Sequence, residues 1–464
     1  MPFFDMDCTL KTHFQKGSKS MKTNVEKLPI AIIGAGPVGL AAAAHLISKG
    51  EPFFIFEYGH SVGASVLEWG HVRMFSPWQY NMDKVAKSLL EQTGWIAPNL
   101  NAIPTGSELV QDYLLPLSNI PEISNNLHLN TQVIGVVRKS MDKLKTSKRQ
   151  ETSFEIYVEK EEQTSIYEVR AVIDASGTWR TPNPVLSNGL WTKAEKNLRD
   201  KIEYGIPNVL GDQREKYANK TVMVVGSGHS AINALLDLSR LKEEFTKTNI
   251  IWVLRKSNIS QVYGGQEKDG LPARGELGIR IRKLVECGAL KVFTPFHIHT
   301  IKQEENSVTV KGLYKSEETI INRIDQLIVS TGFRPDTSFL NEVRIHLDSA
   351  VESVEALAPL IDPNVHSCGT VRPHGEAELR QPEEGLYIVG MKSYGRAPTF
   401  LLATGYEQVR SVVAYLTDDL KGAKEVHLVL PETGVCHVGV SNCCDESAIS
   451  DVNTCDTETK CNSF

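Results

Sequence analysis

Two glycine-rich segments, each lying between a short apolar run and a helical pattern, constrain the fold of this chain more than any other feature. The first reads "IAIIGAGPVGLAAAAHL" and carries Gly34, Gly36 and Gly39 in a G-x-G-x-x-G pattern. The first glycine permits a tight turn, the second lets the backbone approach a pyrophosphate, and the third lets the helix pack closely on the strand. The segment therefore predicts a strand at residues 30–33, a phosphate-binding turn and a helix.

An acidic residue follows this unit at the spacing expected for a ribose contact. The next apolar stretch, "PFFIFE", ends at Glu57, about 20 residues beyond the glycines. The start of the helix offers free N–H groups and a partial positive charge to phosphates. We therefore predict that the unit binds the ADP half of FAD, through Gly34, Gly36, Pro37, Gly39 and Glu57. A glycine turn in some other α/β unit is the alternative.

The same pattern occurs a second time in "KTVMVVGSGHSAINALLDL", where Gly226, Gly228 and Ala231 form G-x-G-x-x-A. The following apolar stretch, "IIWVLRK", ends in Arg255 and Lys256 where the first unit ends in an acid. Two cations suit the 2′-phosphate of NADP, and the carboxylate that NAD prefers is missing. Solvated loop cations and the use of NADH are the alternatives. The residues predicted to contact NADPH are Gly226, Gly228, His229, Ser230, Ala231, Arg255 and Lys256.

Two units of this kind predict an α/β fold with two Rossmann-like dinucleotide-binding domains. Apolar strands run into "DASGTWRTPNP" and "STGFRPD", and each enters a glycine turn that is followed by proline. We interpret these turns as crossings between an FAD-binding domain and an inserted NADPH-binding domain. The predicted limits are 28–180 and 335–425 for the two parts of the FAD-binding domain, 181–334 for the NADP-binding domain, 1–27 for a disordered extension and 426–464 for a Cys-rich tail.

The turns at the ends of these strands supply further predicted cofactor contacts. The stretch "GLYIVGMKSYGRAPTFLLATG" predicts a strand at residues 386–389 and a helix that begins near residues 399–403. The N-terminus of that helix would suit the flavin, where negative charge grows on reduction. An ordinary core helix is the alternative. The residues predicted to contact a cofactor in these turns are Ser176, Gly177, Thr331, Gly332, Gly390, Met391 and Thr399.

Charge and hydropathy argue against two classes of partner. The formal net charge is −6 with both signs mixed, which argues against a nucleic-acid surface or a polybasic membrane patch. The chain has no apolar run of about 18 residues, so no membrane span is predicted. Before the tail the cysteines are isolated at Cys8, Cys287 and Cys368, which suits a reducing, cytoplasmic setting. The sequence makes no prediction of oligomeric state.

Together these residues resemble the two-dinucleotide-fold flavoproteins, in particular the class B flavin monooxygenase-like group. The resemblance covers residues 28 to about 425 and rests on "GAGPVG", "DASG", "GSGHSA", "STGFRPD" and "GLYIVG". The segments "VGASVLEWGHVRMFSPWQYNMD" and "YGIPNVLG", with the tail, resemble flavin monooxygenase-like proteins encoded in arsenic-resistance clusters. The resemblance implies an FAD-containing, NADPH-dependent oxidoreductase. It would use molecular oxygen, through a flavin C4a-hydroperoxide, to oxygenate a small sulfur or arsenic compound.

The chain departs from this resemblance in three places. The Gly-Asp pair that relatives place near the FAD pyrophosphate and ribityl chain reads Gly390-Met391. The F-x-G-x-x-x-H linker of monooxygenases is not intact, and "WTKAEKNLRDKIEYGIPN" occupies its region. The C-x-x-C or C-x-x-x-x-C pair of disulfide reductases does not occur before the tail. A flavin reductase that passes electrons to the tail thiols, or to a metalloid bound there, is therefore the alternative function.

In the resembled family the chain passes the flavin ring at the segment "GHVRMFSPWQYNMD". Ser76 and Asn81 are the candidates for hydrogen bonding to an oxygenated flavin, and Trp78 is the candidate for excluding water. The alternative is a packing loop whose tryptophan fills a gap. Arg274, in "GLPARGELG", is predicted to meet the nicotinamide nucleotide, with an exposed loop arginine as the alternative.

Five of the eight cysteines lie in the last 29 residues. We predict that Cys436, Cys443 and Cys444 converge on a soft ion such as trivalent arsenic, because thiolates favour such ions. A vicinal disulfide, a zinc site with His437, or incidental thiols are the alternatives. The tail would then hold a thiophilic substrate for the flavin site, or act as an ion-binding module of its own.

Overall fold

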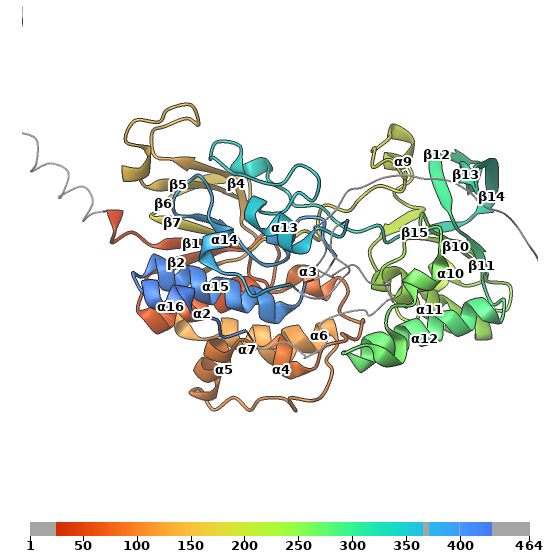
Figure 1. Ribbon diagram of the computed structural model, residues 1–464, viewed down its shortest axis with the longest axis horizontal. Helices are drawn as coiled ribbons and strands as arrows, with labels where there is room; N and C mark the ends of the chain where they lie inside the picture. Colours follow the sequence, from red (N-terminus) through yellow and green to blue (C-terminus); the bar gives the residue numbers. More distant parts are fainter. Residues whose placement is uncertain (1–24, 365–370, 399, 429–464) are drawn as a thin grey trace, which may run out of the picture.

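The computed structural model describes residues 25–364, 371–398 and 400–428. Within these ranges the chain forms two α/β lobes, one from the red, orange and blue parts of the chain and one from the green parts (Figure 1). Each lobe contains a five-stranded parallel sheet, which confirms the predicted fold class. The predictions for Thr399 and for the tail cysteines Cys436, Cys443 and Cys444 lie outside the described residues, as does most of the predicted extension at residues 1–27.

The first lobe is built on a parallel sheet whose central strands are buried. Its strands, in spatial order, are β16 (Leu386–Ile388), β7 (Ala171–Asp174), β1 (Ile30–Ile33), β2 (Phe53–Phe56) and β3 (Leu127–His128). Continuous apolar runs form such strands because both faces of a parallel sheet are covered. Strand β16, which comes from the C-terminal part of the chain, pairs with β7 from Leu386 opposite Val172 to Ile388 opposite Asp174.

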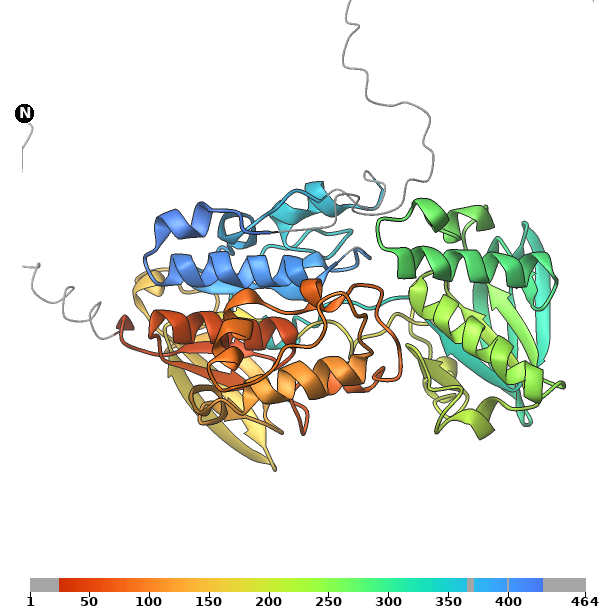
Figure 2. The ribbon, with the colours of Figure 1, turned by 90° about the horizontal axis from the view of Figure 1, so that it is seen from below.

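Helices cover one face of this sheet and a second, antiparallel sheet covers the other. The helices are α2 (Pro37–Lys49), α5 (Lys84–Glu91) and α15 (Leu402–Leu416). Figure 2 shows the red α2 and the blue α15 side by side. The antiparallel strands are β4 (Gln132–Arg138), β5 (Phe154–Lys160) and β6 (Gln163–Val169). Tyr167 of β6 packs edge-on against Phe54 and Phe56 of β2, which joins the two sheets.

The second lobe repeats this three-layer plan. Its parallel strands, in spatial order, are β11 (Lys291–Phe293), β10 (Asn249–Val253), β9 (Thr221–Val225), β15 (Gln326–Val329) and β8 (Ile202–Tyr204). Val222 and Val224 of β9 pack toward the helices, whereas Met223 and Val225 pack toward an antiparallel sheet, as side chains alternate along a strand. The covering elements are α11 (His229–Glu244), α12 (Pro272–Glu286), β12 (Phe296–Glu304), β13 (Ser307–Tyr314) and β14 (Glu317–Ile324).

The chain crosses between the lobes twice, and the two crossing segments lie side by side. Pro182 and Phe333 form an isolated antiparallel bridge. The Asn183 N–H donates to the Gly332 carbonyl at 2.9 Å, and the ring of Trp179 stacks on Phe333 with centroids 4.6 Å apart. The division of the chain into domains at residues 180 and 334 stays a prediction, and it falls at these two passages.

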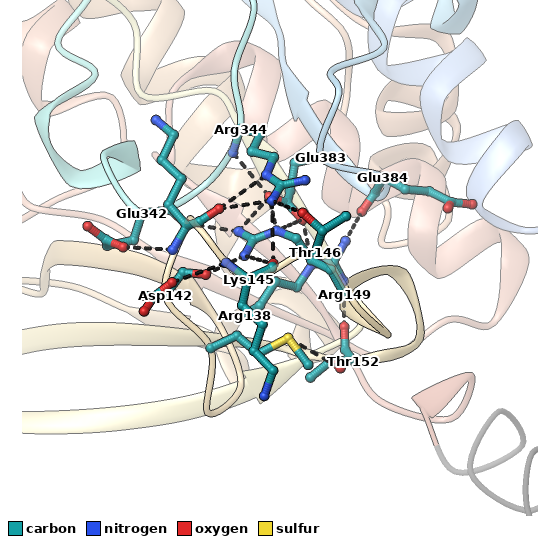
Figure 3. Close-up of polar contacts among 12 residues, drawn as sticks. Arg138, Asp142, Lys145, Thr146, Arg149, Thr152, Glu342, Arg344, Glu383 and Glu384 are labelled. Carbon is teal, nitrogen blue, oxygen red and sulfur yellow. Dashed lines mark hydrogen bonds and ion pairs between the residues drawn. The ribbon is translucent and has the colours of Figure 1, made fainter.

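A buried ion cluster fastens the segment between β15 and β16 to the β4–β6 sheet (Figure 3). Glu383 is fully buried and accepts from the guanidinium of Arg138 at 2.8 Å and from that of Arg149 at 2.8 Å. Burial acts to raise the pKa of Glu383, but the hydrogen bonds from Arg149, Arg138 and the Arg344 amide outweigh it and lower the pKa below its ordinary value. The cluster therefore keeps a charged carboxylate inside the lobe and ties three distant segments together.

Short helices and turns complete the described chain. The α-helical ones are α3 (Ala64–Leu67), α4 (Trp78–Asn81), α6 (Gly106–Glu108), α7 (Leu115–Ser118), α8 (Pro121–Ser124), α9 (Lys193–Lys196), α10 (Arg214–Tyr217), α13 (Ala358–Ile361), α14 (Glu376–Leu379) and α16 (Leu420–Lys424). Segment η1 (Leu109–Leu114) is π-helical, and the 3₁₀ turns are η2 (Arg149–Glu151), η3 (Ile259–Val262), η4 (Gln266–Lys268), η5 (Ser338–Leu340), η6 (Glu355–Leu357) and η7 (Gly390–Tyr394). Among the described residues, no helix is both long and apolar enough to cross a membrane.

Candidate functional site

The first glycine turn combines close backbone contacts with one open position. Gly34 has a φ of 99°, and a Cβ there would lie 2.8 Å from the carbonyl oxygen of Ala175. A Cβ on Gly39 would lie 2.0 Å from the carbonyl oxygen of Gly34, whereas a Cβ on Gly36 would meet no atom within 4 Å. Pro37 begins α2. Gly34 and Gly39 are therefore required by the fold itself, and Gly36 leaves space where a pyrophosphate would meet the helix start.

Glu57 follows β2 directly and turns its carboxylate toward the glycine turn. Its Oε2 accepts the N–H of Ala35 at 2.7 Å, and its Oε1 accepts the N–H of Gly59 at 2.7 Å. A carboxylate has about four lone-pair positions, so these two bonds leave acceptor capacity on both oxygens. The placement is compatible with the predicted ribose contact, which stays a prediction.

Ser176 and Gly177 lie in the turn that follows β7, beside the first glycine turn. The Ser176 hydroxyl donates to Oδ1 of Asp174 at 2.6 Å, so this side chain is held internally. Gly177 has a φ of 71°, in the left-handed region that favours glycine, and a Cβ there would meet no atom within 4 Å. Gly177 therefore borders open space, whereas Ser176 contributes mainly to the shape of the turn.

Gly390 and Met391 follow β16, at the same edge of the sheet. Gly390 has a φ of 68° and donates its N–H to Oε1 of Gln408 at 2.7 Å. A Cβ on Gly390 would lie 3.3 Å from the side chain of Val38, in the first turn of α2. The structure thus brings Gly34, Gly36, Glu57, Gly177 and Gly390 to one edge of the first sheet.

The second glycine turn has the same construction. Gly226 has a φ of 137°, and a Cβ there would lie 2.2 Å from the carbonyl oxygen of Ser330. A Cβ on Gly228 would meet no atom within 4 Å. Ala231, at the third position, is fully buried in α11, and Ser230 lies beside it in the first turn of the helix. A small residue is needed at Gly226 and Ala231 for packing, and Gly228 provides the open position.

Arg255 and Lys256 are exposed at the end of β10, at the same edge as the second turn. Arg255 donates from Nη1 to the carbonyl of Ser187 at 3.1 Å, which uses part of its guanidinium. Within the described part of the chain, the ammonium of Lys256 has no ion-pair partner. The arrangement fits both the predicted 2′-phosphate contact and its alternative of solvated cations. Thr331 and Gly332 directly follow Ser330, which touches the second glycine turn, and they bond to Asn183 in the passage between the lobes.

The three catalytic candidates form one compact unit around α4. Ser76 and Asn81 bond to each other: the Ser76 hydroxyl donates to Asn81 Oδ1 at 2.8 Å, and Asn81 Nδ2 donates to the Ser76 carbonyl at 2.7 Å. Trp78 is buried between them in sequence, at 3% exposure. Tyr406 of α15 donates its hydroxyl to the Asn81 carbonyl at 2.7 Å. The unit is therefore fixed to the first lobe, and one Nδ2 hydrogen of Asn81 remains available.

The residue that precedes this unit reaches the second lobe. Phe75 lies with its ring centroid 5.3 Å from that of His229, the first residue of α11. Its ring also lies 5.9 Å from the guanidinium of Arg274. His229 keeps access to solvent, but surrounding protein atoms and then the Arg274 charge lower its pKa to about 4. His229 is therefore neutral at physiological pH, beside the expected pyrophosphate position.

The structure contradicts the alternative prediction that Arg274 is an exposed loop arginine. It is not an exposed loop residue: it lies in the first turn of α12 at 7% exposure. Its Nη2 and Nε bind the carboxylate of Asp269, at 2.6 Å and 2.8 Å. Because this ion pair occupies one edge of the guanidinium, Arg274 serves first to hold the N-terminus of α12 against residues 265–269.

Sequence reasoning missed several residues beside the two turns. Lys392, which is fully buried, lies 2.6 Å from Asp174, and Gln408 bonds to Gly390. Phe75, which joins the α4 unit to His229, was also not singled out. No local signal identifies these residues, since each partner lies far away in the sequence. Only the contrast between a lysine and the apolar positions around it, in "YIVGMKSYG", hinted at a special role for Lys392.

Two glycine turns at the carboxyl edges of two parallel sheets, one followed by an acid and one by cations, define an NAD(P)H-dependent flavoprotein oxidoreductase. The open positions at Gly36, Gly177 and Gly228 fit its cofactors, FAD and NAD(P)H. Residues 31–368 match the family described as pyridine nucleotide-disulphide oxidoreductase. The chain belongs to this family.

Curated relatives and solved structures agree with this assignment. A ferredoxin–NADP reductase from Lactobacillus johnsonii is 24% identical over 345 residues, which are 74% of this chain and 86% of the relative. One from Lactobacillus helveticus is 23% identical and covers 84% of this chain and 96% of its own length.

Among solved structures, the bacillithiol disulfide reductase Bdr (YpdA) from Bacillus cereus has a TM-score of 0.59 at 18% identity, over 84% of this chain and 99% of the other. The ornithine N-hydroxylase KtzI from Kutzneria sp. 744 has a TM-score of 0.57 at 13% identity, over 85% and 100%. At these identities the likeness establishes the fold.

Proposed function

We propose that this protein is an NADPH-dependent flavin monooxygenase that oxygenates a small soft nucleophile, a sulfur or arsenic compound. The observation that carries the proposal is the buried Ser76–Asn81 pair, which is held in the first lobe and lies next in sequence to a contact with the second glycine turn. The pair is fixed to α15 of the first lobe through Tyr406, and the adjacent Phe75 contacts His229 of the second turn. A polar group held at this place is suited to chemistry that takes place between FAD and the nicotinamide.

The side chains of this unit have distinct proposed tasks. Asn81 offers its free Nδ2 hydrogen to a developing negative charge, and Ser76 holds the amide in one orientation. Trp78 fills the space behind them and keeps water out of the site. Asp83 fastens the unit to α2, because its carboxylate lies 3.1 Å from His45 and caps α5. Arg255 and Lys256 would bind the 2′-phosphate of NADPH.

The positions of the cysteines indicate which electron acceptor the flavin can use. Family names refer to disulfide chemistry, but residues 9–286 of this chain contain no cysteine, and Cys287 is an isolated, exposed thiol. Electrons that leave the flavin must therefore go to a partner outside this part of the chain. The chemistry that a bound FAD would supply is acceptance of a hydride from NADPH and two-electron reduction of oxygen. The balance is NADPH, H⁺, O₂ and substrate giving NADP⁺, water and a substrate that has gained one oxygen atom.

A second candidate is a reductase that gives its electrons to another acceptor. The names of the curated relatives, ferredoxin–NADP reductases, favour a one-electron carrier. The clustered cysteines of residues 436–461 favour the tail thiols or a metalloid bound to them, and they also support a separate ion-binding role for the tail. The resemblance to proteins of arsenic-resistance clusters supports a trivalent arsenical as the substrate or bound ion in each version.

Oxygen consumption with the purified FAD-loaded protein tests the proposal. With NADPH and a trivalent arsenical or a small thioether, we expect one O₂ consumed per NADPH and a product that gains one oxygen. Asn81→Ala should keep NADPH oxidation but divert oxygen to hydrogen peroxide, with product formation about tenfold to a hundredfold lower. The matched variant Asn125→Ala, at an exposed position after α8, should behave like the natural protein.

Three results would contradict the monooxygenase. Anaerobic NADPH turnover that disappears in the double variant Cys443→Ser, Cys444→Ser would assign the electrons to the tail. Anaerobic reduction of a ferredoxin, with no oxygen incorporated into any tested substrate, would assign them to a protein carrier. Binding of the arsenical without any turnover would leave the tail as an ion-binding module.

A further inference from the structure

The first lobe contains a fully buried ion pair directly behind its cofactor turns. Asp174 is the last residue of β7, and Lys392 lies in η7; both side chains are 0% exposed. Nζ of Lys392 lies 2.6 Å from Oδ2 of Asp174, outside hydrogen-bond alignment, so the contact is an ion pair. Buried pairs of this kind seldom add stability over apolar residues of similar volume. The position of the pair, at the edge of the sheet that carries the first glycine turn, therefore requires a separate explanation.

Ser176 completes the network on the β7 side. Lys392 donates to the Ser176 hydroxyl at 3.0 Å, and Ser176 donates its hydroxyl and its N–H to Oδ1 of Asp174, at 2.6 Å and 3.1 Å. The backbone is joined as well, since the Val389 N–H donates to the Asp174 carbonyl at 2.9 Å. The aromatic face of Phe339 lies 4.4 Å from the ammonium. The turn after β7 and the turn after β16 are thus held together by a charge as well as by the sheet.

Gln408 holds the other side of η7. This fully buried residue of α15 accepts the Gly390 N–H at 2.7 Å and donates from Nε2 to the Ser393 hydroxyl at 2.9 Å. Ser393 in turn donates to the Gly390 carbonyl at 2.7 Å. The turn that carries Met391 is therefore clamped from both sides, and its conformation does not depend on an acidic side chain at position 391.

Both clamped turns touch the first glycine turn. The backbone of Ala175 and Ser176 lies 2.8–2.9 Å from the Cβ position of Gly34, and Gly390 faces Val38 in the first turn of α2. A shift of either turn would move the backbone around the open position at Gly36. The ion pair therefore lies inside the protein, behind the site predicted to receive the FAD pyrophosphate. Both of its side chains are shielded from solvent.

We propose that Asp174 and Lys392 are positioning residues for FAD: their ion pair locks the β7 and β16 turns in the geometry that receives the cofactor. Relatives have an acidic residue where this chain has Met391. In this chain the Asp174–Lys392 ion pair takes over the role of that acidic residue in holding the FAD site. The inference concerns cofactor binding and holds whichever acceptor the flavin reduces. Asp174 and Lys392 act through Ser176, Gly177 and Gly390, and they make no contact with the cofactor themselves.

Affinity for FAD, measured on the full chain after the flavin is removed, tests the lock. We expect Lys392→Met and Asp174→Asn each to raise the dissociation constant of FAD about tenfold, the equivalent of one or two lost hydrogen bonds. The double variant should lose no more FAD affinity than the single variant that binds FAD more weakly, because both changes break the same ion pair. A shift of the bound flavin's visible spectrum and fluorescence should accompany the loss.

The buried ion cluster around Glu383 supplies the matched control. Arg149→Met removes an equally buried charge from the same lobe, away from the cofactor turns, and should lower the thermal midpoint of the flavin-free protein without changing its affinity for FAD. Unchanged FAD affinity in folded Lys392→Met and Asp174→Asn would overturn the proposal, as would an equal loss in Arg149→Met. If Lys392→Met fails to fold, Lys392→Gln and Asp174→Asn decide in the same way.

Discussion

Individual glycines at the two turns serve different purposes, although the pattern G-x-G-x-x-G gives them equal weight. Gly34, Gly39 and Gly226 are required because a Cβ would collide with backbone oxygen at 2.0–2.8 Å. Gly36 and Gly228 face open space, and their φ values of −80° and −87° suit any residue. The first group therefore preserves the fold, and the second group preserves room for a ligand.

Alanine substitutions separate these two purposes. Gly36→Ala should change the free energy of unfolding of the flavin-free protein by about 1 kcal/mol or less, since a weaker N-cap is offset by a less flexible unfolded chain. It should nevertheless weaken FAD binding at least about tenfold, because a methyl group occupies the space of the pyrophosphate. Gly39→Ala should cost about 3 kcal/mol of stability. Denaturant titration and FAD titration of both variants measure the two effects.

Gly228→Ala is the counterpart in the second lobe. It should weaken NADPH binding and leave FAD affinity as it is in the natural protein. Equal loss of both nucleotides in Gly36→Ala and Gly228→Ala would contradict the assignment of one nucleotide to each turn.

The roles of individual residues could be predicted from the sequence only where the residues that act together are close in the chain. The glycines, Glu57 and the pair Arg255 and Lys256 follow strands at fixed spacing, and the structure places each at the expected edge of its sheet. Lys392 was not predicted, since its partner Ser176 is 216 positions away. The exposed-loop alternative for Arg274 was wrong because nothing in the sequence shows that Asp269 turns back to meet it.

At the scale of elements, most of the parallel strands were predictable and the antiparallel sheets were not. The predicted strands are short apolar runs followed by glycine turns or charges, and they are β1, β2, β7, β9, β10, β15 and β16. The edge strands β3, β8 and β11 have only two or three residues, with charged or polar side chains among them, and were not predicted. The predicted strand at residues 386–389 ends at Ile388, and the helix expected near residues 399–403 begins at Leu402. Strands β4–β6 and β12–β14 carry mixed patterns with bulges, and their register depends on contacts between segments.

The ion cluster around Glu383 shows how one such sheet is attached. Glu383→Gln should lower the free energy of unfolding by about 3–5 kcal/mol, because the guanidinium groups of Arg138 and Arg149 would stay buried without a carboxylate. Chemical denaturation at neutral pH measures this loss. In contrast, Glu91→Gln, which breaks an exposed ion pair with Lys87, should cost no more than about 0.5 kcal/mol. A similar small effect for both variants would show that the cluster does not hold the sheet.

At the scale of the whole molecule, histidines with lowered pKa values tie stability to pH. Burial is the main cause that lowers the pKa of His71, His128, His229 and His374 from 6.5, to about 4 for His229. These side chains bind a proton more readily in the unfolded chain than in the folded one. The stability of the folded protein is therefore complete above pH 6.5 and falls as the pH drops toward 4. Glu195 and Asp237, whose pKa values burial raises, act in the opposite sense within the carboxylate range.

Thermal midpoints between pH 7.5 and pH 4.5 test this dependence. The natural protein should lose stability across the range, and His229→Gln should lose less, since it removes a histidine whose pKa is lowered to about 4. His60→Gln, at an exposed position, should follow the natural protein. A pH profile that His229→Gln leaves unchanged would contradict the lowered pKa of this side chain.

The two passages between the lobes lie next to each other, with the Asn183 N–H bonded to the Gly332 carbonyl. Everything between them leaves and re-enters the first lobe at one spot, while the strands on either side remain paired in a single sheet. A gene segment coding for such an insert can be lost, duplicated or replaced in evolution by a simple splice, without disturbing the host's architecture. The same first lobe can thus be recombined with second lobes of different nucleotide preference, and new enzymes can arise by exchange of an insert while the core of the host lobe stays unchanged.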